Sequence, residues 1–413
     1  MKVDINTQNR LKTARIKMSK TCPSHETNKL WPMVRLGDVC RVVLGGTPKT
    51  GIPEYWDGDI PWLTPGDMGK IAQMYVDASN CKRKITQLGL DSGSTLCPAR
   101  SVILSTRAPI GYVFVNSVPM ATNQGCKTLV PSDDVYPEYL CFNLLGRTDE
   151  LNELGTGTTF KELATGNLKA MTLPLPPLSE QKEIVARLER ELAAVEKMKK
   201  GFEALAETAK AEFKAELKEV FEELRCSGVE MKRLGEVGRV AMCKRVLKDQ
   251  TSDNGDVPFF KIGTFGKEPN AYISNELFDE FVKKFSYPKK GDVLISAAGT
   301  IGRTIVFDGK PSYFQDSNIV WLEHDGTKVT NEYLHCFYWS KPWKISDGAT
   351  IPRIYNGDIE SVEIPLLSLP VQRQIVARLS AAKTRTEKLE AKAREGVAVC
   401  ATMRKAILKE AFE

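Results

Sequence analysis

The sequence predicts an α+β protein in which two tandem globular units alternate with two long helices. Three observations support this. The 413-residue chain repeats a pattern of motifs at an offset of about 190 residues. Each repeat opens with a region rich in glycine, proline, aromatic and β-branched residues, which is typical of short strands and turns. Each repeat closes with a segment almost free of proline and glycine, in which apolar residues follow a 4-3 spacing.

The duplication is clearest where a globular unit gives way to a helix. The five residues Ile184–Leu188 recur as Ile375–Leu379. In both copies a proline (Pro174, Pro365) and a glutamine (Gln181, Gln372) precede them at matching places. Weaker matches occur upstream in the same order: 35–39 with 233–237, 58–62 with 255–259, 102–105 with 293–296, and 138–140 with 332–334. A repeat of this length indicates an architecture that is used twice.

These boundaries divide the chain into five parts, listed here in order. They are a basic N-terminal arm (1–30), a first globular unit (31–177), a central helix (178–226), a second globular unit (227–368) and a C-terminal helix (369–413). In the globular units, the runs 102–104, 112–115, 293–295 and 319–322 predict strands, and 137–145 and 331–339 predict short helices. Each unit is therefore expected to be a small α+β domain with a curved sheet. Trp56, Trp62, Phe259 and Phe260 are expected to pack in cores or loops rather than bind a ligand.

The two helical segments are predicted to form a coiled coil, with Ser179 capping the first. Their apolar positions are 184, 188, 192, 195, 202, 205, 209, 213, 217, 220 and 224 in the first, and 375, 379, 382, 389, 393, 400, 403 and 407 in the second. Each helix would be roughly 60–70 Å long at 1.5 Å per residue. Residues 178–224 carry 9 basic and 12 acidic residues, and residues 370–413 carry 10 and 5. The opposite net charges favour pairing of the two helices over two separate solvated helices.

The distribution of charge along the chain indicates which parts could bind an acidic partner. The N-terminal arm has 7 basic and 2 acidic residues, whereas residues 31–177 have 13 and 14, and residues 225–369 have 19 and 19. The net charge of +6 therefore lies outside the globular units, which contain only local basic clusters. No stretch approaches 18 apolar residues, and the N-terminus lacks a secretory pattern, so no membrane association is expected. Ten scattered cysteines without a C-x-x-C pair are typical of a reduced, cytoplasmic protein.

Motifs for catalysis are missing from the sequence. Gly45–Thr50 superficially resembles a phosphate-binding loop, but it lacks the G-x-x-x-x-G-K-[ST] spacing, and Pro48 removes a backbone donor. Three histidines are present, and none forms part of a metal-ligand pattern. We therefore expect a binding and scaffolding protein with no catalytic residue and no metal site.

The motifs of the chain resemble those of the DNA specificity subunit of type I restriction-modification systems. The segments that carry the resemblance are 36–39, 45–48, 59–67, 121–125 and 173–181, together with the duplicated Gln-x-x-Ile-Val. In the second unit the Gly-Gly-Thr-Pro element and the Asn-Gln pair have no clear counterpart. The resemblance implies two target recognition domains, each reading one half of a split double-stranded DNA target. It also implies that the helices pair as an antiparallel coiled coil with pseudo-two-fold symmetry and set the distance between the half-sites.

The resemblance further implies partners. Two methyltransferase subunits would dock on this chain and methylate an adenine in each half-site, with S-adenosylmethionine bound to them and no cofactor bound by this chain. Restriction subunits, which combine motor and nuclease, would complete the complex. Two other interpretations remain open: a DNA-binding or scaffold protein outside restriction, and a self-contained DNA methyltransferase or nuclease.

Base edges are read by polar and basic side chains on loops. In the first unit the candidates are Thr47, Lys49, Thr64, Lys82, Arg83, Lys84, Arg107, Asn123, Gln124, Thr158 and Lys161. In the second unit they are Lys244, Arg245, Lys261, Arg303, Gln315, Ser317, Asn318 and Arg353. Any one of them could instead be a turn residue, and Asn123 in particular a structural hydrogen-bonding group. On the helices, Gln181, Arg187, Gln372 and Arg378 are expected at a subunit interface or at the joint with the recognition domains.

Overall fold

The computed structural model describes residues 31–157, 161–340, 343 and 353–412, so the N-terminal arm lies outside the described residues. The chain divides into two compact units. Unit 1 comprises residues 1–197 and 400–413, and unit 2 comprises residues 198–399. Each unit therefore contains one globular part and a stretch of both long helices. The five-part division made from the sequence remains a prediction, because the compact units are divided within the helices.

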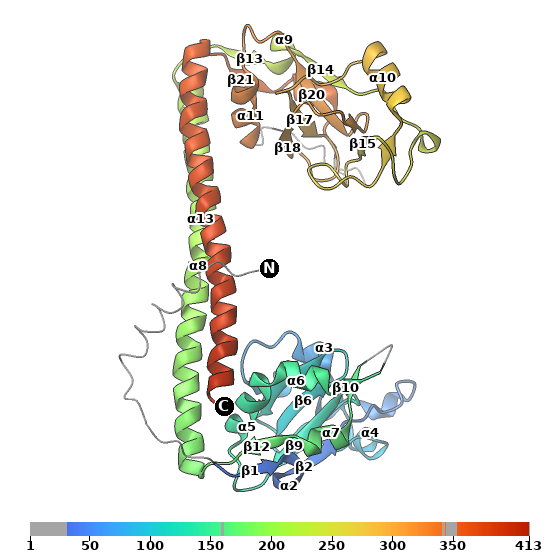
Figure 1. Cartoon of the computed structure of the whole chain (residues 1–413), viewed down its shortest axis with the longest axis vertical. Helices are drawn as coiled ribbons and strands as arrows, with labels where there is room; N and C mark the ends of the chain where they lie inside the picture. Colours follow the sequence, from blue (N-terminus) through green and yellow to red (C-terminus); the bar gives the residue numbers. More distant parts are fainter. Residues whose placement is uncertain (1–30, 158–160, 341–342, 344–352, 413) are drawn as a thin grey trace. The chain divides into compact units, whose positions relative to one another are not determined.

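Unit 1 contains a five-stranded sheet in the order β2-β9-β6-β7-β4 and a three-stranded sheet in the order β5-β3-β8 (Figure 1). Two further pairs, β1-β12 and β10-β11, complete its strands. The strands are β1 (Met33–Arg35), β2 (Cys40–Leu44), β3 (Trp56–Leu63), β4 (Tyr75–Val76), β5 (Arg83–Ile85), β6 (Val102–Thr106), β7 (Ile110–Asn116), β8 (Ala121–Thr122), β9 (Cys126–Pro131), β10 (Gly155–Thr156), β11 (Glu162–Leu163) and β12 (Thr172–Pro174). The helices are α2 (Leu36–Val39), α3 (Pro65–Met68), α4 (Gln87–Asp91), α5 (Pro137–Gly146), α6 (Thr148–Glu153) and α7 (Thr165–Ala170).

The core of unit 1 forms around β6, which is buried along its whole length. Its β-branched and leucine side chains suit a strand that is covered on both faces. Helix α5 begins with Pro137 at its first turn, where a proline costs no hydrogen bond, and packs against β7. Leu188 of the first long helix and Leu408 of the second are buried in the same cluster. The core of unit 1 is thus completed by both long helices.

Unit 2 repeats this plan with fewer strands. Its sheets have the orders β14-β20-β17-β18, β16-β15-β19 and β13-β21. The strands are β13 (Met231–Arg233), β14 (Arg239–Met242), β15 (Val257–Phe260), β16 (Tyr272–Ile273), β17 (Val293–Ser296), β18 (Thr304–Val306), β19 (Tyr313–Phe314), β20 (Ile319–Glu323) and β21 (Glu363–Pro365). The helices of its globular part are α9 (Leu234–Val237), α10 (Asn275–Lys284), α11 (Asn331–Trp339) and α12 (Asn356–Glu360). The strands and short helices predicted in both units all fall on observed elements.

The long helices are α8 (Leu178–Cys226) and α13 (Leu369–Glu410) (Figure 1). In unit 2 they run antiparallel: as residue numbers increase along α8, the residues that they contact on α13 decrease in number. Glu216 lies 3.1 Å from Arg378 and 3.3 Å from Arg385, whereas Lys210 lies 3.9 Å from Glu390. The predicted pairing of the two helices is confirmed, and in two of these three ion pairs the acidic residue lies on α8 and the basic one on α13. No helix within the described part of the chain is long and apolar enough to span a lipid bilayer.

The seam between the helices differs from the predicted pattern at three positions. Leu205 was expected in the seam, but its side chain is 39% exposed, and the less exposed Ala206 follows it. Thr386 and Gly396 are buried on α13 although neither is a large apolar residue. The Thr386 hydroxyl donates to the Ala209 carbonyl oxygen across the seam at 3.4 Å, so the buried hydroxyl has a hydrogen-bond partner. A Cβ at Gly396 would lie 2.5 Å from the ring of Phe202, so glycine makes room for that ring.

A buried glutamine joins each globular part to its helix. The Gln181 side chain accepts a hydrogen bond from the Tyr136 amide and donates to the carbonyl oxygens of Asp134 and Pro176, at 2.7, 2.8 and 2.8 Å. Gln372 accepts from Thr330 and donates to Lys328 and Leu367 at 3.0, 2.7 and 2.9 Å. Each glutamine thus fixes the first turn of a long helix to the loop that enters α5 or α11.

Candidate nucleic-acid interface

The loop that follows β2 is held in place by two tryptophans. The indole Nε1 of Trp62 donates to the Gly46 carbonyl oxygen at 3.0 Å, and that of Trp56 donates to the Lys49 carbonyl oxygen at 3.3 Å. Both indoles are buried, with their ring centroids 5.1 Å apart. The expectation that these tryptophans pack a loop is confirmed. Thr47 and Lys49 therefore expose their side chains on a loop whose backbone is held by hydrogen bonds from the two buried indoles.

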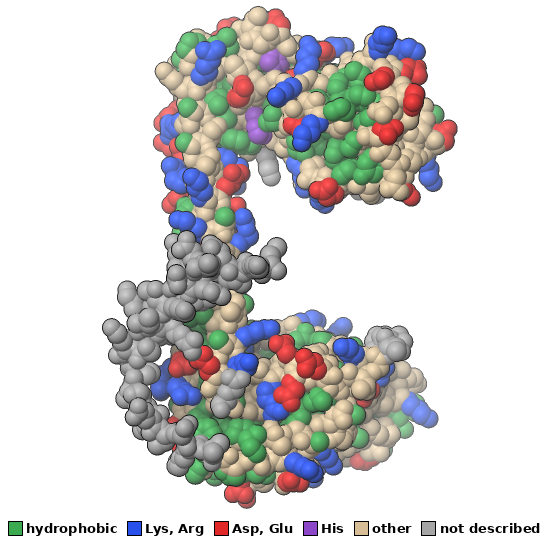
Figure 2. All heavy atoms as spheres, viewed as in Figure 1, with side chains coloured by type: hydrophobic (Ala, Val, Ile, Leu, Met, Phe, Trp, Pro, Cys, Tyr) green, Lys and Arg blue, Asp and Glu red, His purple; other side chains and the backbone are tan. Residues whose placement is uncertain are grey.

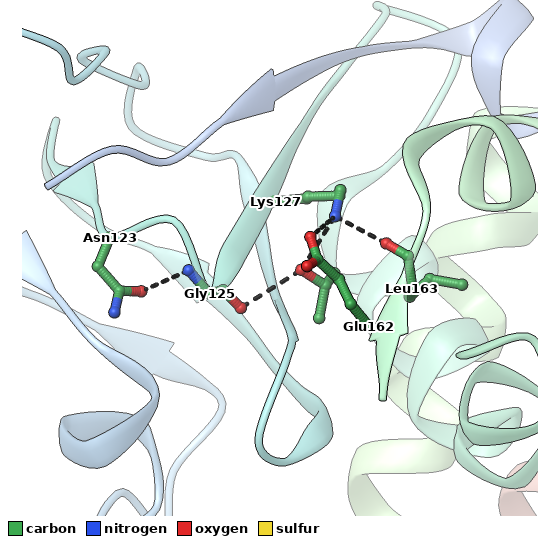
Figure 3. A network of polar contacts seen from close by, with 6 residues as sticks. Asn123, Gly125, Lys127, Glu162 and Leu163 are labelled. Carbon is green, nitrogen blue, oxygen red and sulfur yellow. Dashed lines mark hydrogen bonds and ion pairs between the residues drawn. The ribbon is translucent and has the colours of Figure 1, made fainter. Parts of the chain in front are cut away.

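Thr47 and Gln124 are brought together by this loop. The Thr47 hydroxyl donates to Oε1 of Gln124, which lies in the turn between β8 and β9. Both side chains are exposed. Asn123 beside them accepts a hydrogen bond from the Gly125 amide at 3.0 Å, so its oxygen stabilises the turn (Figure 3). This is the structural role that the sequence left open for Asn123.

A second group of candidates lies on β5 and on the residue before it, at the sheet that contains β3 and β8. The Arg83 guanidinium stacks on the Trp56 ring at 3.4 Å from its centroid, whereas Lys82 and Lys84 are exposed. Stacking fixes the guanidinium plane and leaves its edge available for hydrogen bonds. Thr64 is different, because it caps α3 through a reciprocal pair of hydrogen bonds with Asp67. The contacts of its side chain are internal to the unit.

The hairpin of β10 and β11 is anchored by Lys127, a buried lysine that the sequence did not single out. Its Nζ donates to the Leu163 carbonyl oxygen at 2.7 Å and lies 3.4 Å from Glu162 and 3.3 Å from the Thr106 hydroxyl (Figure 3). A buried ammonium group is tolerated only with such partners. The hairpin carries the exposed candidate Lys161, and Arg107 forms a β-bridge with Glu162. Thr158 lies outside the described residues.

In unit 2, six of the eight candidates line one open pocket of about 350 Å³. The complete lining comprises Arg245, Val246, Leu247, Lys248, Thr251, Phe259, Lys261, Gln315, Asp316, Ser317, Asn318 and Arg353. Four of these side chains are cationic and one is acidic. The remaining two candidates lie outside the pocket: the Arg303 guanidinium donates to the Phe265 carbonyl oxygen, and Lys244 lies over the Phe285 ring. The sequence thus identified half of the residues that line this pocket, and among the polar ones it missed Lys248, Thr251 and Asp316.

The pocket is organised by hydrogen bonds from its own side chains. Arg245 Nε donates to Oδ2 of Asp316 at 2.9 Å, and Arg353 donates to the Ser317 carbonyl oxygen at 2.7 Å. Gln315 Oε1 accepts from the Ile262 amide at 2.9 Å, so this side chain stabilises the pocket wall. Ser317 has a φ of 52°, which places its carbonyl oxygen in reach of Arg353. The pocket is therefore a preformed arrangement of donors.

A thiol and a phenol, those of Cys243 and Tyr313, are buried in one hydrophobic cluster of unit 2. Burial raises the pKa of Cys243 to about 12, and it also raises that of Tyr313. Both groups therefore stay protonated at neutral pH. The Tyr313 hydroxyl oxygen accepts a hydrogen bond from the Lys244 amide at 3.0 Å and so holds the start of the loop that carries Arg245.

Charges of both signs are spread over unit 2. On the face seen in Figure 2, hydrophobic side chains gather in the middle of the unit that carries α10, and basic and acidic side chains surround them. This agrees with the near-zero net charge of that part of the sequence. The cations of the pocket are therefore a local feature.

Among the described residues, no cluster of three or more histidine, cysteine or acidic side chains could hold a metal ion. The helix candidates differ in exposure. Gln181 and Gln372 are fully buried and form their hydrogen bonds within the joints described above. Of the two locations that the sequence left open for them, the geometry favours the joint. Arg187 is exposed on α8, and Arg378 pairs with Glu216 across the helices.

Comparison with known proteins supports this reading of the architecture. The model of the type I restriction modification DNA specificity domain matches residues 28–202 and 226–397. A Haemophilus influenzae protein assigned as a type I restriction enzyme specificity subunit is 47% identical over 231 residues, which is 55% of this chain and 60% of that protein. The chain thus spans less than two thirds of that relative. The specificity subunit of the MjaIX restriction enzyme from Methanocaldococcus jannaschii is 27% identical over 83% of this chain and 84% of its own length.

Solved structures show the same fold. A chain from a study of complex assembly and conformational transition in a type I R-M system superposes with a TM-score of 0.71, covering 94% of this chain and 99% of its own, at 21% identity. The HsdS subunit of Thermoanaerobacter tengcongensis superposes with a TM-score of 0.53 over 94% and 98% of the two chains, also at 21% identity. The family model covers both repeats. The chain therefore belongs to the family of type I restriction-modification DNA specificity subunits.

Proposed function

We propose that this chain reads a bipartite double-stranded DNA target, with one globular part contacting each half-site. The pocket of unit 2 carries this proposal, because four cations and several amide and hydroxyl groups converge there on loops. Cations contact phosphates, and Arg, Asn, Gln and Ser read base edges in the grooves. In unit 1 the corresponding candidates are the loops that carry Thr47 and Gln124, together with strand β5, which carries Lys84.

Family membership supports a non-catalytic role inside a larger complex. We infer that two methyltransferase subunits dock on this scaffold and supply S-adenosylmethionine and the methyl-transfer chemistry, and that restriction subunits join them. The paired helices would act as a spacer between the half-sites. One inserted heptad would lengthen a helix by roughly 10 Å, or about three base pairs.

Near-neutral globular parts imply modest affinity for DNA by this chain alone. Non-specific binding comes from phosphate neutralisation, which needs many cations at one surface. We therefore expect tight binding only with the methyltransferase partner. The basic N-terminal arm (1–30) remains a further candidate for phosphate contacts.

Footprinting of the purified chain with its methyltransferase partner tests the proposal. Protection in two patches, separated by a stretch without sequence preference, is the expected result, and it should weaken as salt rises. The matched control is the same complex on DNA lacking the target. A footprint that is absent, or that is indifferent to sequence, contradicts the proposal. Methyl transfer by this chain without a partner would instead favour a self-contained methyltransferase.

A further inference from the structure

The two globular parts place an interacting pair of side chains at the same point of the fold. In unit 1, strands β3 and β8 run parallel with Leu63 opposite Thr122, and the Asn123 amide then donates to the Leu63 carbonyl oxygen at 3.1 Å. In unit 2, β15 and β19 run parallel with Phe260 opposite Phe314, and the Gln315 amide donates to the Phe260 carbonyl oxygen at 3.0 Å. Asn123 and Gln315 are therefore equivalent, and so are the residues that follow them, Gln124 and Asp316.

The loop that meets this turn is equivalent in the two units as well. Strand β2 ends opposite β9, with Leu44 facing Lys127, and β14 ends opposite β20, with Met242 facing Val320. Three residues beyond these strand ends lie Thr47 and Arg245. Thr47 contacts Gln124, and Arg245 contacts Asp316. The same pair of positions is thus joined in both units, by neutral groups in unit 1 and by an ion pair in unit 2.

The ion pair orients Arg245 for a particular kind of ligand. The bond to Asp316 uses Nε, and the two terminal nitrogens lie beyond it on a side chain that is 68% exposed. Two parallel donors of this kind match O6 and N7 of guanine in the major groove. A phosphate is a poorer fit, because the Asp316 carboxylate would repel it. Lys248 and Lys261 of the same pocket, which have no acidic partner in the hydrogen bonds and ion pairs described, suit phosphate better.

We propose that Arg245, positioned by Asp316, reads a guanine in the half-site of unit 2, and that the equivalent pair reads a base in unit 1 with the two roles exchanged, so that Gln124, at the position of Asp316, is the reader and Thr47, at the position of Arg245, holds it. This inference rests on the proposed DNA-recognition function. Glutamine forms its two-bond contact with adenine rather than guanine. The difference between the two pairs would then give the two half-sites different bases at equivalent positions, although the fold around them is the same.

Sequencing of methylated adenines in cells that carry the complete system tests the proposal. The variants are Arg245→Lys, Asp316→Asn and, as the matched pocket control, Lys248→Ala. For Arg245→Lys we expect the preference for guanine to fall by roughly 10- to 100-fold at one position of one half-site, with the other half-site unchanged. Asp316→Asn should relax the same position to a smaller extent, which a purely structural role would not do. Lys248→Ala should lower methylation at every site without changing the motif.

A swap of the pair supplies a second test. The double variant Arg245→Thr, Asp316→Gln places the unit 1 pair in unit 2, and we expect the base preferred at that position to move from guanine towards adenine. If Arg245→Lys abolishes methylation, the purified variant complex is tested for binding to the target with each base pair exchanged in turn. An unchanged guanine preference in either assay overturns the inference. If the wild-type chain itself directs no methylation motif, the proposed function fails instead.

Discussion

Gln181 and Gln372 make the same three hydrogen bonds at the start of the two long helices. In each case the amide group is fully buried, and it satisfies one backbone N–H and two carbonyl oxygens. A single side chain thus completes the hydrogen bonding of the loop before α5 or α11 and of the turn before the helix. Two tyrosines support the same joints, since Tyr139 and Tyr333 donate to the carbonyl oxygens of Pro174 and Pro365 at 2.8 and 3.0 Å.

Replacement of Gln372 by leucine should destabilise unit 2. The change leaves three buried backbone groups without a partner, and the expected loss is on the order of 3 kcal/mol in the free energy of unfolding. Urea unfolding followed by circular dichroism would measure it. Gln374→Leu is the matched control, because Gln374 is exposed on the same helix turn. Equal stability of the two variants would contradict a structural role for the buried amide.

The ion pairs across the helix seam should contribute little and depend on salt. Glu216 contacts both Arg378 and Arg385, but both arginines are more than half exposed. Glu216→Ala should therefore cost about 1 kcal/mol or less in low salt, and less still in 1 M NaCl. The control is Glu223→Ala, at an exposed position about two turns further along α8. A loss of several kcal/mol that salt does not reduce would contradict this view.

Two lysines near the β10-β11 hairpin should behave in opposite ways. Lys127→Met removes a buried anchor and leaves the Leu163 carbonyl oxygen without its ammonium donor, so unit 1 should lose roughly 1–3 kcal/mol of stability. Lys161→Met, at an exposed position of the same hairpin, should leave the melting temperature unchanged and weaken DNA binding. Thermal unfolding and DNA binding measured on both variants separate the two roles. Reduced stability of Lys161→Met would count against its assignment as a DNA contact.

Buried thiols should make the protein sensitive to alkali. Burial raises the pKa of Cys126 and of Cys243 from 9.0 to about 12. Because the unfolded thiol ionises near pH 9 and the folded one does not, stability is complete below pH 9 and falls as pH rises from 9 towards 12. Each thiol contributes a slope of up to about 1.4 kcal/mol per pH unit. Unfolding measured from pH 8 to 11 should be less steep in Cys243→Ala and unchanged in the exposed control Cys226→Ser.

A phosphate contact should appear in the salt dependence of binding. Lys84→Ala should weaken binding of the complex equally on all sequences, and the slope of log affinity against log salt should decrease by about 0.9. Lys169→Ala, at an exposed position on α7 and outside the β5-β3-β8 sheet, is the control and should leave the slope unchanged. A change in sequence preference caused by Lys84→Ala would indicate a base contact instead.

The long helices and the duplicated plan were predictable because both depend on regular patterns. Apolar spacing places Leu188 and Leu379 in the buried seam, where both are fully buried. The spacing could not identify Thr386 or Gly396 as seam residues, since one buries a hydroxyl through a hydrogen bond and the other makes room for Phe202. Such positions depend on the facing helix, about which a single helical segment carries no information.

The candidate interface was predictable only in part. Residue type and loop position identified six of the nine polar residues that line the pocket of unit 2, because basic and amide side chains between strands are seldom needed by a core. The equivalence of Gln124 and Asp316 was missed, since the residue types differ and Ser317 adds one residue to the turn. Gln124 lies between the apolar strands β8 and β9, and Asp316 lies between the apolar strands β19 and β20. An alignment of these flanking strands could have shown that the two residues are equivalent. Lys127 was overlooked because a lysine in a strand usually points to solvent, whereas here the hairpin provides its partners.

The division of the chain has a consequence for the order in which the protein is made. Leu408 and Ala411 are buried in the core of unit 1, and the ring of Phe412 lies 5.2 Å from that of Tyr139. Unit 2, by contrast, ends at residue 399. On the ribosome, the core of the part that is translated first can be completed only after residues 408–412 have been made, whereas all of unit 2 precedes them. A premature stop after residue 399 would therefore damage the beginning of the protein and spare its middle.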